Sequence, residues 1–214
     1  MKIAKNDAEF ILNGRTINYT DYGSEKLPAI IFIHGFPYNK LMWKDQMEVF
    51  EGNYRIIAYD ILGKLRSDEY SIDFSVKSFV NDLINIMDSL QIDKASVCGL
   101  SLGGFVAIKG IESYPDRIES LLISDINSVG DRSITKADGI AAIENIRFKG
   151  VNEFNDENLK ILFSSESLAI NLNEIAMSWE MIVKSASLSN FKTIEVKNSM
   201  RRNLIKKRTA LAIE

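Results

Sequence analysis

The chain has 214 residues, of which 46% are hydrophobic and 26% are charged, as in one ordinary globular domain that needs no disulfide or structural metal to fold. A single cysteine, Cys98, excludes an internal disulfide, and a single histidine, His34, excludes a multi-histidine metal centre. The net charge of −3 gives no global basic field for nucleic acid.

The N-terminal ten residues mix Lys, Asn, Asp and Glu without an apolar stretch, so we expect no signal peptide. No apolar run approaches the roughly 18 residues of a transmembrane helix. We therefore expect a cytoplasmic protein that binds neither membrane nor nucleic acid. A basic region at residues 192–214 is interpreted as a solvated connector rather than a nucleic-acid-binding or membrane-binding tail. Its basic residues are Lys192, Lys197, Arg201, Arg202, Lys206, Lys207 and Arg208.

Strand signals come first along the chain. The pair Asn13-Gly14 predicts a tight hairpin between strands at residues 9–13 and 15–21. Four continuous apolar runs then predict strands buried on both faces, as in a parallel sheet that is covered by helices. These runs are AIIFI at 29–33, RIIAY at 55–59, ASVCG at 95–99 and SLLIS at 120–124.

Helical patterns alternate with the later strands. Apolar residues recur at intervals of three and four, which places them on buried stripes of two helices, the second ended by Pro115. The first stripe consists of Phe79, Leu83, Ile86, Met87 and Leu90, and the second of Phe105, Ala107, Ile108 and Ile111. Repeated strand–helix–strand units predict an α/β fold with a mostly parallel sheet.

After Asp125 the sequence becomes polar and rich in Lys, Glu and Asn, with apolar residues at helical spacing. No strand signal of comparable strength occurs in residues 131–190. We therefore expect three parts: an α/β core at 1–125, a helical cap at 126–191, and a basic connector at 192–214. The connector includes a candidate seventh strand at Thr209–Ile213.

The strongest chemical signal is GLSLG at residues 99–103, which follows a strand and precedes a helix. This is the G-x-S-x-G nucleophile elbow in the context that its chemistry requires. A sharp turn exposes the hydroxyl of Ser101, while Gly99 and Gly103 avoid collisions with neighbouring backbone. The N–H of Leu102 lies at the helix N-terminus, where it can stabilise an oxyanion. A serine that merely caps the helix is the alternative interpretation, which the context disfavours.

A second signal, His34-Gly35-Phe36-Pro37, follows the strand at 29–33. In this position the N–H of Phe36 is the second oxyanion donor, and His34 and Gly35 support the loop. The competing interpretation makes His34 the general base for Ser101. We disfavour it, because a residue at the start of this loop points away from the nucleophile.

Together these segments resemble the α/β-hydrolase fold superfamily, in particular small ester and lactone hydrolases of the 3-oxoadipate enol-lactonase and proline iminopeptidase-like type. The matching segments are residues 34–46, 54–68, 98–104 and 114–125. The resemblance implies Ser101 as nucleophile, Phe36 and Leu102 as oxyanion donors, and a helical cap over a pocket for a small ester-like or lactone-like substrate. We expect no cofactor and no metal. One departure is Leu65, where members usually carry the second glycine of the turn after Asp60.

In this superfamily the acid and the base follow the serine, near the seventh and eighth strands. No histidine follows Ser101 here, so we expect a C-terminally truncated domain that lacks the last strand or strands. A serine without a general base is a poor nucleophile at neutral pH. Asp125 lies where some members carry an alternative acid, and a cap for the following turn explains this residue equally well.

A truncated sheet leaves unpaired backbone groups at its edge, so we expect self-association through that edge. The main functional hypothesis is a serine hydrolase of small esters or lactones that is inactive or weak as this chain alone. The alternative is a non-catalytic pseudoenzyme or fragment that binds a ligand without turnover. A third hypothesis gives the basic tail an interaction role.

Overall fold

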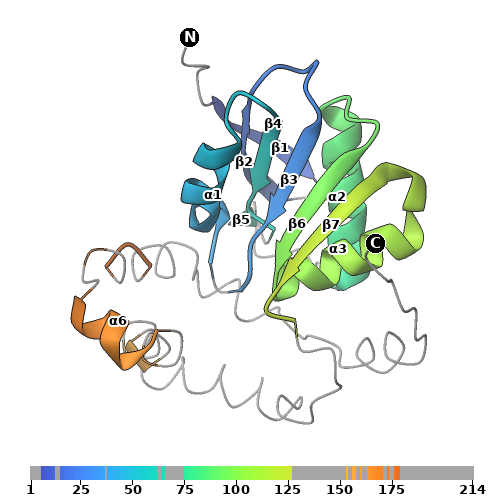
Figure 1. The fold of residues 1–214 in the computed structure, drawn as a ribbon. Helices are drawn as coiled ribbons and strands as arrows, with labels where there is room; N and C mark the ends of the chain where they lie inside the picture. The colour runs from blue at the N-terminus through green and yellow to red at the C-terminus, as the bar shows by residue number, and fades with distance from the viewer. Residues whose placement is uncertain are drawn as a thin grey trace, which may run out of the picture.

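A mixed sheet of seven strands forms the centre of the computed structural model (Figure 1). The structure describes residues 6–12, 15–36, 38–61, 64–65, 75–126, 153, 156–157, 160, 163–170, 173 and 176–178. The strands are β1 (Asn6–Leu12), β2 (Arg15–Tyr22), β3 (Ala29–Ile33), β4 (Arg55–Tyr59), β5 (Lys64–Leu65), β6 (Ala95–Leu100) and β7 (Ile118–Ser124).

The strand order is β1-β2-β4-β3-β6-β7, and β5 pairs with β2 outside this path. Strands β1 and β2 form an antiparallel pair whose register runs from Asn6 opposite Asp21 to Leu12 opposite Arg15, which confirms the predicted hairpin. Strand β2 is also antiparallel to β4, whereas β4, β3, β6 and β7 run parallel to one another. The predicted α/β class with a mostly parallel sheet is confirmed.

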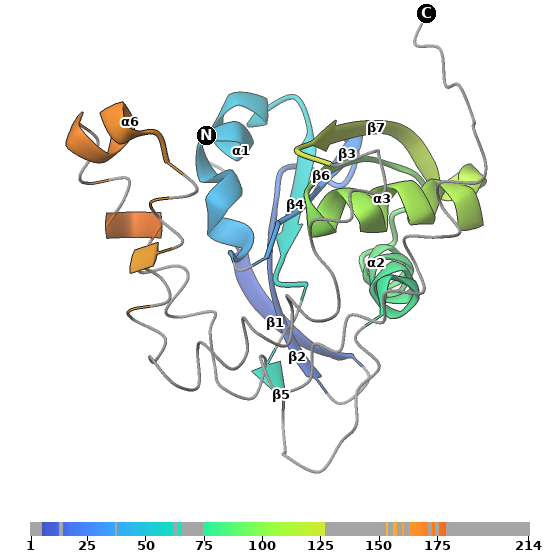
Figure 2. The ribbon, with the colours of Figure 1, turned by 90° about the horizontal axis from the view of Figure 1, so that it is seen from below.

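Helices cover the sheet on both faces (Figure 2). The 3-10 helix η1 (Lys40–Trp43) and helix α1 (Lys44–Phe50) lie on one face, where Trp43 and Met47 join a buried cluster with Phe32. Helices α2 (Val76–Ser89) and α3 (Leu102–Ser113) lie on the other face and contribute to the larger cluster. Because both faces are covered, every residue of β3 and β4 is buried, as their continuous apolar runs predict.

Helix α2 follows its predicted stripe closely. Ser75 and Ser78 form a reciprocal capping box, in which each side-chain oxygen accepts the other residue's backbone N–H at 3.1 Å. Four of the five residues in the predicted stripe are fully buried, and Leu90 is partly buried against the same cluster.

Helix α3 is turned relative to the expectation, because only Ala107 of its predicted stripe is buried. The buried positions carry mostly small residues, and these let the helix axis approach the sheet closely, while the larger apolar residues lie at its flanks. They are Gly103, Gly104, Val106, Ala107 and Gly110. The helix ends at Ser113, and Pro115 opens the 3-10 helix η2 (Pro115–Arg117), as predicted.

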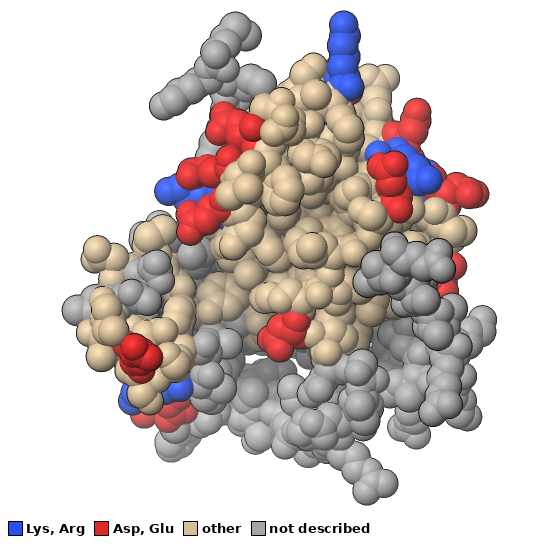
Figure 3. Space-filling view, in the orientation of Figure 1, with Lys and Arg blue, Asp and Glu red and all other residues tan. Residues whose placement is uncertain are grey.

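Five of the seven residues of β7 are exposed, so its predicted burial on both faces is wrong. Ile118 is buried, and Leu121 is partly buried against the larger cluster. The exposed fractions of Leu122 and Ile123 are 62% and 39%. Among the residues that the structure describes, β7 pairs with β6 alone. The face shown in Figure 3 carries few charged side chains over its central part.

Self-association through the β7 edge of the sheet stays a prediction.

Beyond residue 126 the structure describes helix α6 (Ser165–Ile170) and a few further helical residues. The boundaries of the cap at 126–191 stay predictions, and the basic connector with its strand at Thr209–Ile213 lies outside the described residues. Within the described ranges, no helix has the length and apolarity needed to cross a membrane.

Two leucines, one buried in α2 and one exposed in β7, test the exposed placement of β7. Leu83→Ala in α2 should lower the free energy of unfolding by about 2–5 kcal/mol, because Leu83 is fully buried. Leu122→Ala in β7 should change it by less than about 1 kcal/mol. Urea unfolding of both variants measures the difference, and equal losses would contradict the exposed placement of β7.

Candidate active site

Ser101 lies between β6 and α3, at the end of the parallel strands. Its φ of +48° and ψ of −108° put a non-glycine residue in a rarely populated region, which persists only where the surrounding structure holds it. Its N–H donates to the carbonyl of Ser124 at 3.0 Å, and its own carbonyl accepts from Phe105 at 3.1 Å. Its hydroxyl makes no capping hydrogen bond to α3, so the helix-cap interpretation lacks the contact that it requires.

Close backbone contacts on both sides of Ser101 explain the two glycines of the motif. A Cβ added to Gly99 would lie 2.4 Å from the carbonyl oxygen of Gly103. One added to Gly103 would lie 2.2 Å from the carbonyl oxygen of Ile33. Neither contact can be relieved by moving a flexible side chain, since the neighbouring atoms belong to the backbone. The elbow is therefore packed directly against β3 and the loop that follows it.

The loop after β3 reaches Ser101. A Cβ built on Gly35 would lie 3.5 Å from the Cβ of Ser101 and 3.3 Å from the carbonyl oxygen of Leu100. The structure thus brings the two motifs together, although they are separated by more than sixty residues in the sequence.

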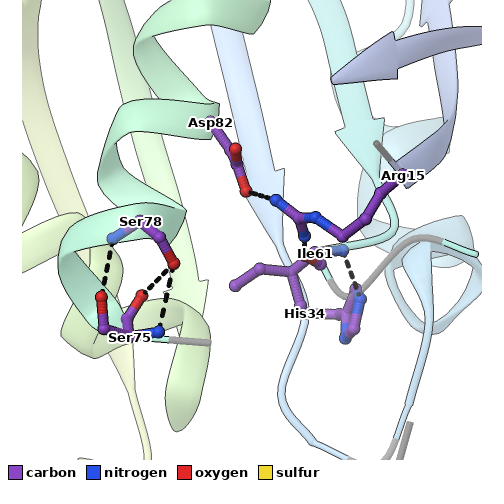
Figure 4. A network of polar contacts seen from close by, with 6 residues as sticks. All are labelled: Arg15, His34, Ile61, Ser75, Ser78 and Asp82. Atoms are coloured by element: carbon purple, nitrogen blue, oxygen red, sulfur yellow. Dashed lines mark hydrogen bonds and ion pairs between the residues drawn. The ribbon is translucent and has the colours of Figure 1, made fainter. Parts of the chain in front are cut away.

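His34 is buried, and both of its ring nitrogens make hydrogen bonds, of which Figure 4 shows the one to Ile61. Nε2 accepts the backbone N–H of Ile61 at 3.0 Å, which assigns the ring proton to Nδ1. Nδ1–H then donates to the carbonyl of Gly35 at 2.9 Å. Burial lowers the pKa of His34, against the opposing effects of the Gly35 hydrogen bond and the Asp60 carboxylate. The ring is therefore neutral and supports the loop.

The carbonyl of Gly35 accepts a second hydrogen bond, from the N–H of Tyr38 at 2.9 Å. The Gly35 carbonyl and the Phe36 N–H belong to one planar trans peptide group, in which they point in opposite directions. Two donors that hold the carbonyl therefore also fix the direction of the Phe36 N–H.

Leu102 is the first residue of α3. The first N–H groups of a helix have no intrahelical acceptor, and in α3 the hydrogen bond from Phe105 to Ser101 marks where such bonding begins. The positive end of the helix dipole adds to the effect of these donors. A negative charge that develops beside Ser101 would be stabilised by the N–H groups and the dipole at the N-terminus of α3.

Asp125 directly follows β7, is exposed, and has a φ of +52°. Aspartate is one of the few residues that tolerates this left-handed conformation. The hydrogen bond between Ser101 and Ser124 places Asp125 next to the elbow along the backbone. Its two interpretations, alternative acid and cap of the following turn, both stay predictions.

Two residues near the loop have roles that the sequence did not suggest. Asp60, after β4, accepts the N–H of Lys40 at 2.9 Å and ties the start of η1 to the sheet. Tyr38 makes a side-chain hydrogen bond with Ser178, so residues beyond β7 reach the loop. Burial raises the pKa of Tyr38, and the bond to Ser178 opposes that shift. A lone tyrosine in a loop gives no sequence signal for such a contact.

Leu65, which stands in place of the second glycine, lies in β5 and pairs with Arg15 of β2. Cys98 is a buried thiol, and burial raises its pKa to about 11. In the part of the chain that the structure describes, no three His, Cys, Asp or Glu residues gather as a metal site.

Comparison with known proteins gives one matching family model, described as alpha/beta hydrolase fold, which covers residues 28–158. The chain is 29% identical over 109 residues to 3-oxoadipate enol-lactonase 2 of Acinetobacter baylyi, which is 51% of this chain and 41% of that protein. It is 31% identical over 116 residues to epoxide hydrolase 1 of Caenorhabditis elegans, which is 53% of this chain and 29% of that protein. The chain spans less than half the length of these curated relatives.

Among solved structures, the enol-lactonase from Burkholderia xenovorans LB400 is similar in fold. The TM-score is 0.75 at 22% sequence identity, and the alignment covers 87% of this chain and 73% of that structure. At this identity the likeness concerns the fold alone, and it agrees with the sheet and helices described above.

Two glycines of α3 test the close approach of the elbow. Gly103→Ala should lower the free energy of unfolding by about 1–3 kcal/mol or more, because the new Cβ meets backbone of Ile33. A Cβ added to Gly110 would lie 2.9 Å from the terminal Cδ1 of Ile118 and 3.6 Å from the Cδ2 of Leu83, both of them side-chain ends. Gly110→Ala should therefore cost clearly less than Gly103→Ala, since side-chain ends can shift and alanine favours the helix. Urea unfolding distinguishes the two variants, and a Gly103→Ala protein as stable as Gly110→Ala would refute the packing.

The neutral state of His34 predicts a pH dependence of stability. The ordinary imidazole pKa is 6.5, and burial lowers it in the folded state. Below that value the unfolded chain binds more protons than the folded chain, so the free energy of unfolding should fall as the pH drops through about 6.5, by at most about 1.4 kcal/mol per pH unit.

The control for this dependence is His34→Gln, which has no imidazole. Its unfolding free energy should vary less than that of the wild type between about pH 5.5 and 7.5. Equal slopes in the two proteins would mean that His34 does not titrate differently in the folded state.

Proposed function

The chain belongs to the α/β-hydrolase fold family, and from this premise we propose that it is a serine hydrolase of small ester or lactone substrates. Ser101 is the nucleophile in this proposal. The observation that carries it is the strained Ser101, whose hydroxyl is not used as a cap and which lies against the loop at Gly35.

The substrate class follows from the donors around Ser101. Attack of the Ser101 Oγ on an ester carbonyl carbon forms a C–O bond, breaks the C=O π bond so that its electron pair moves to the oxygen, and passes the hydroxyl proton to a base. The intermediate then collapses, and the bond to the leaving oxygen breaks as that oxygen takes up the proton and becomes an alcohol. Backbone N–H donors that are fixed before the reaction stabilise this charge, which is the main electrostatic term in acyl transfer. The N–H groups of Phe36 and Leu102 are assigned this role. The similarity to an enol-lactonase supports a carbonyl substrate.

The general base is the missing part of the machinery in these 214 residues. His34 is their only histidine, and its two ring nitrogens hold the loop instead of facing a serine proton. Without a base the hydroxyl stays protonated at neutral pH, and only binding and the oxyanion hole contribute to the rate. We therefore propose that the 214-residue chain by itself turns over slowly.

The alternative is a non-catalytic protein that binds a small ester-like ligand at the same place. The engagement of His34 is the observation that favours it, because the chain then holds the donors of the site without its base. The two proposals differ in one outcome, which is whether Ser101 can form a covalent acyl adduct.

Exogenous imidazole can stand in for the missing base and so test the nucleophile. The wild-type chain is incubated with p-nitrophenyl acetate, with and without imidazole, and the acetyl adduct is located by mass spectrometry. We expect slow acetylation of Ser101 that imidazole accelerates, restoring part of the about 10²–10⁴-fold contribution of a positioned base. Ser101→Ala should lose the imidazole-dependent adduct.

Ser120→Ala is the matched control, because Ser120 is an exposed serine of β7 whose hydroxyl contacts Ser96. This variant should be acetylated at the wild-type rate. An adduct that forms at the same rate in Ser101→Ala would refute the proposal that Ser101 is the nucleophile. Binding of the ester without any adduct, unchanged in Ser101→Ala, would establish the non-catalytic alternative.

A further inference from the structure

A buried ion pair lies behind the loop that carries Phe36. The guanidinium of Arg15, at the start of β2, pairs with the carboxylate of Asp82 in α2, and both side chains are 1% exposed (Figure 4). The Arg15 guanidinium also lies over the ring of Phe79, 5.9 Å from its centroid. A buried pair of this kind is weak evidence for stability, because desolvation offsets much of the attraction.

The second contact of Arg15 leads toward the site. Its NH1 nitrogen donates to the carbonyl of Ile61 at 3.1 Å, while the N–H of Ile61 donates to His34 Nε2 at 3.0 Å. Ile61 is fully buried, so neither of its peptide groups can exchange these partners for water. Arg15 and His34 therefore hold Ile61 from its two sides.

The chain of contacts ends at the Phe36 amide. His34 Nδ1–H donates to the carbonyl of Gly35, which belongs to the same planar peptide group as the Phe36 N–H. Three successive hydrogen bonds thus connect the ion pair between β2 and α2 to the donor beside Ser101. Each bond reaches the residue that makes the next one, and at Ile61 the link passes from the carbonyl of one peptide group to the N–H of the preceding peptide group.

We propose that Arg15, held by Asp82, is a positioning residue that sets the direction of the Phe36 N–H through Ile61 and His34. The positioning of the loop stands on these contacts, and its effect on acyl transfer rests on the proposed hydrolase function. Arg15 does not touch the substrate. By holding Ile61, Arg15 keeps the Ile61 N–H donating to His34 Nε2. The ring proton then stays on Nδ1, where it donates to the Gly35 carbonyl.

A second ion pair of the same chemistry provides a matched control. Arg55 of β4 contacts the Asp21 carboxylate at 2.7 Å and donates through NH1 to the carbonyl of Leu90 at 3.0 Å. Like Arg15, it joins a carboxylate to a main-chain carbonyl. Its carbonyl partner lies at the end of α2, however, and no described contact leads from there to the loop.

The test uses the single histidine of the chain. Histidine labelled with ¹⁵N gives ring signals from His34 alone, and their chemical shifts report which nitrogen carries the proton. The paired variant Arg15→Met/Asp82→Asn removes both buried charges together, and Arg55→Met/Asp21→Asn does the same at the control pair. Arg15→Lys is the conservative variant, which keeps the charge opposite Asp82 and loses the planar fork that reaches Ile61.

We expect the wild type and the Arg55 control to show the Nδ1–H tautomer alone. The Arg15→Met/Asp82→Asn and Arg15→Lys proteins should show a mixture of tautomers and a shifted Phe36 amide signal. Unchanged ring and amide signals in both Arg15 variants would overturn the proposal. If the paired variant does not fold, Arg15→Lys decides the question, and equal changes in the Arg55 control would also refute a specific role.

The same proteins separate this proposal from the hydrolase function. Imidazole-dependent acetylation of Ser101 should fall about tenfold in Arg15→Met/Asp82→Asn, less than the about 10²–10³-fold loss typical of a deleted oxyanion donor. It should be unchanged in the Arg55 control. A wild type that is never acetylated would refute the hydrolase function, whereas the His34 tautomer would still decide whether Arg15 positions the loop.

Discussion

The orientation of one peptide group, between Gly35 and Phe36, depends on contacts from several distant parts of the chain. Its carbonyl is held by the imidazole of His34 and by the N–H of Tyr38. The imidazole is held in turn by Ile61, which follows β4. Because buried polar groups must be paired, each of these residues has few alternative arrangements. The parallel sheet, which sets β3 beside β4 and β6, is what allows them to meet.

The same constraint determines what His34 can do. A ring that accepts from Ile61 and donates to Gly35 has no lone pair to offer a serine, and its burial favours the neutral form. Preorganised donors and a base are separate requirements in acyl transfer, and these 214 residues hold candidates for the first without a histidine for the second. Exogenous base therefore distinguishes a hydrolase that lacks its base from a protein that only binds.

Much of the fold followed from simple patterns in the sequence. The continuous apolar runs of β3 and β4 predicted buried strands, and the spacing of Leu83 and Met87 predicted the buried face of α2. The same kind of apolar run gave a wrong prediction of burial at β7. Leu122 and Ile123 are as apolar as the residues of β3 and β4, but they lie in a strand that has one described neighbour. Burial depends on what lies beside a strand, and that is not encoded in the strand itself.

The candidate site was partly predictable, because some of its residues lie in local motifs and others meet only in the folded structure. Local motifs carry Ser101 and His34, so the sequence alone identified both as candidates, and the structure brings their two loops together. Arg15 and Asp82 are 67 residues apart and belong to no motif, and an acidic residue on the buried face of α2 was the one available signal. In α3 the positions that face the sheet are small, so hydrophobic periodicity pointed to the larger residues at the flanks. Contacts made through long sequence separations or through small residues leave little trace in composition.

We propose that two backbone amides, from Phe36 and Leu102, converge on the negative charge that would form beside Ser101. An alkyl boronic acid that adds to the Ser101 Oγ places a negatively charged tetrahedral group at that point. The most direct measurement is the chemical shift of the two amide protons in the NMR spectrum as this adduct forms. We predict that the amide protons of Phe36 and Leu102 both move downfield, because each would donate a hydrogen bond to the adduct. An adduct at Ser101 that leaves either amide unmoved would contradict it.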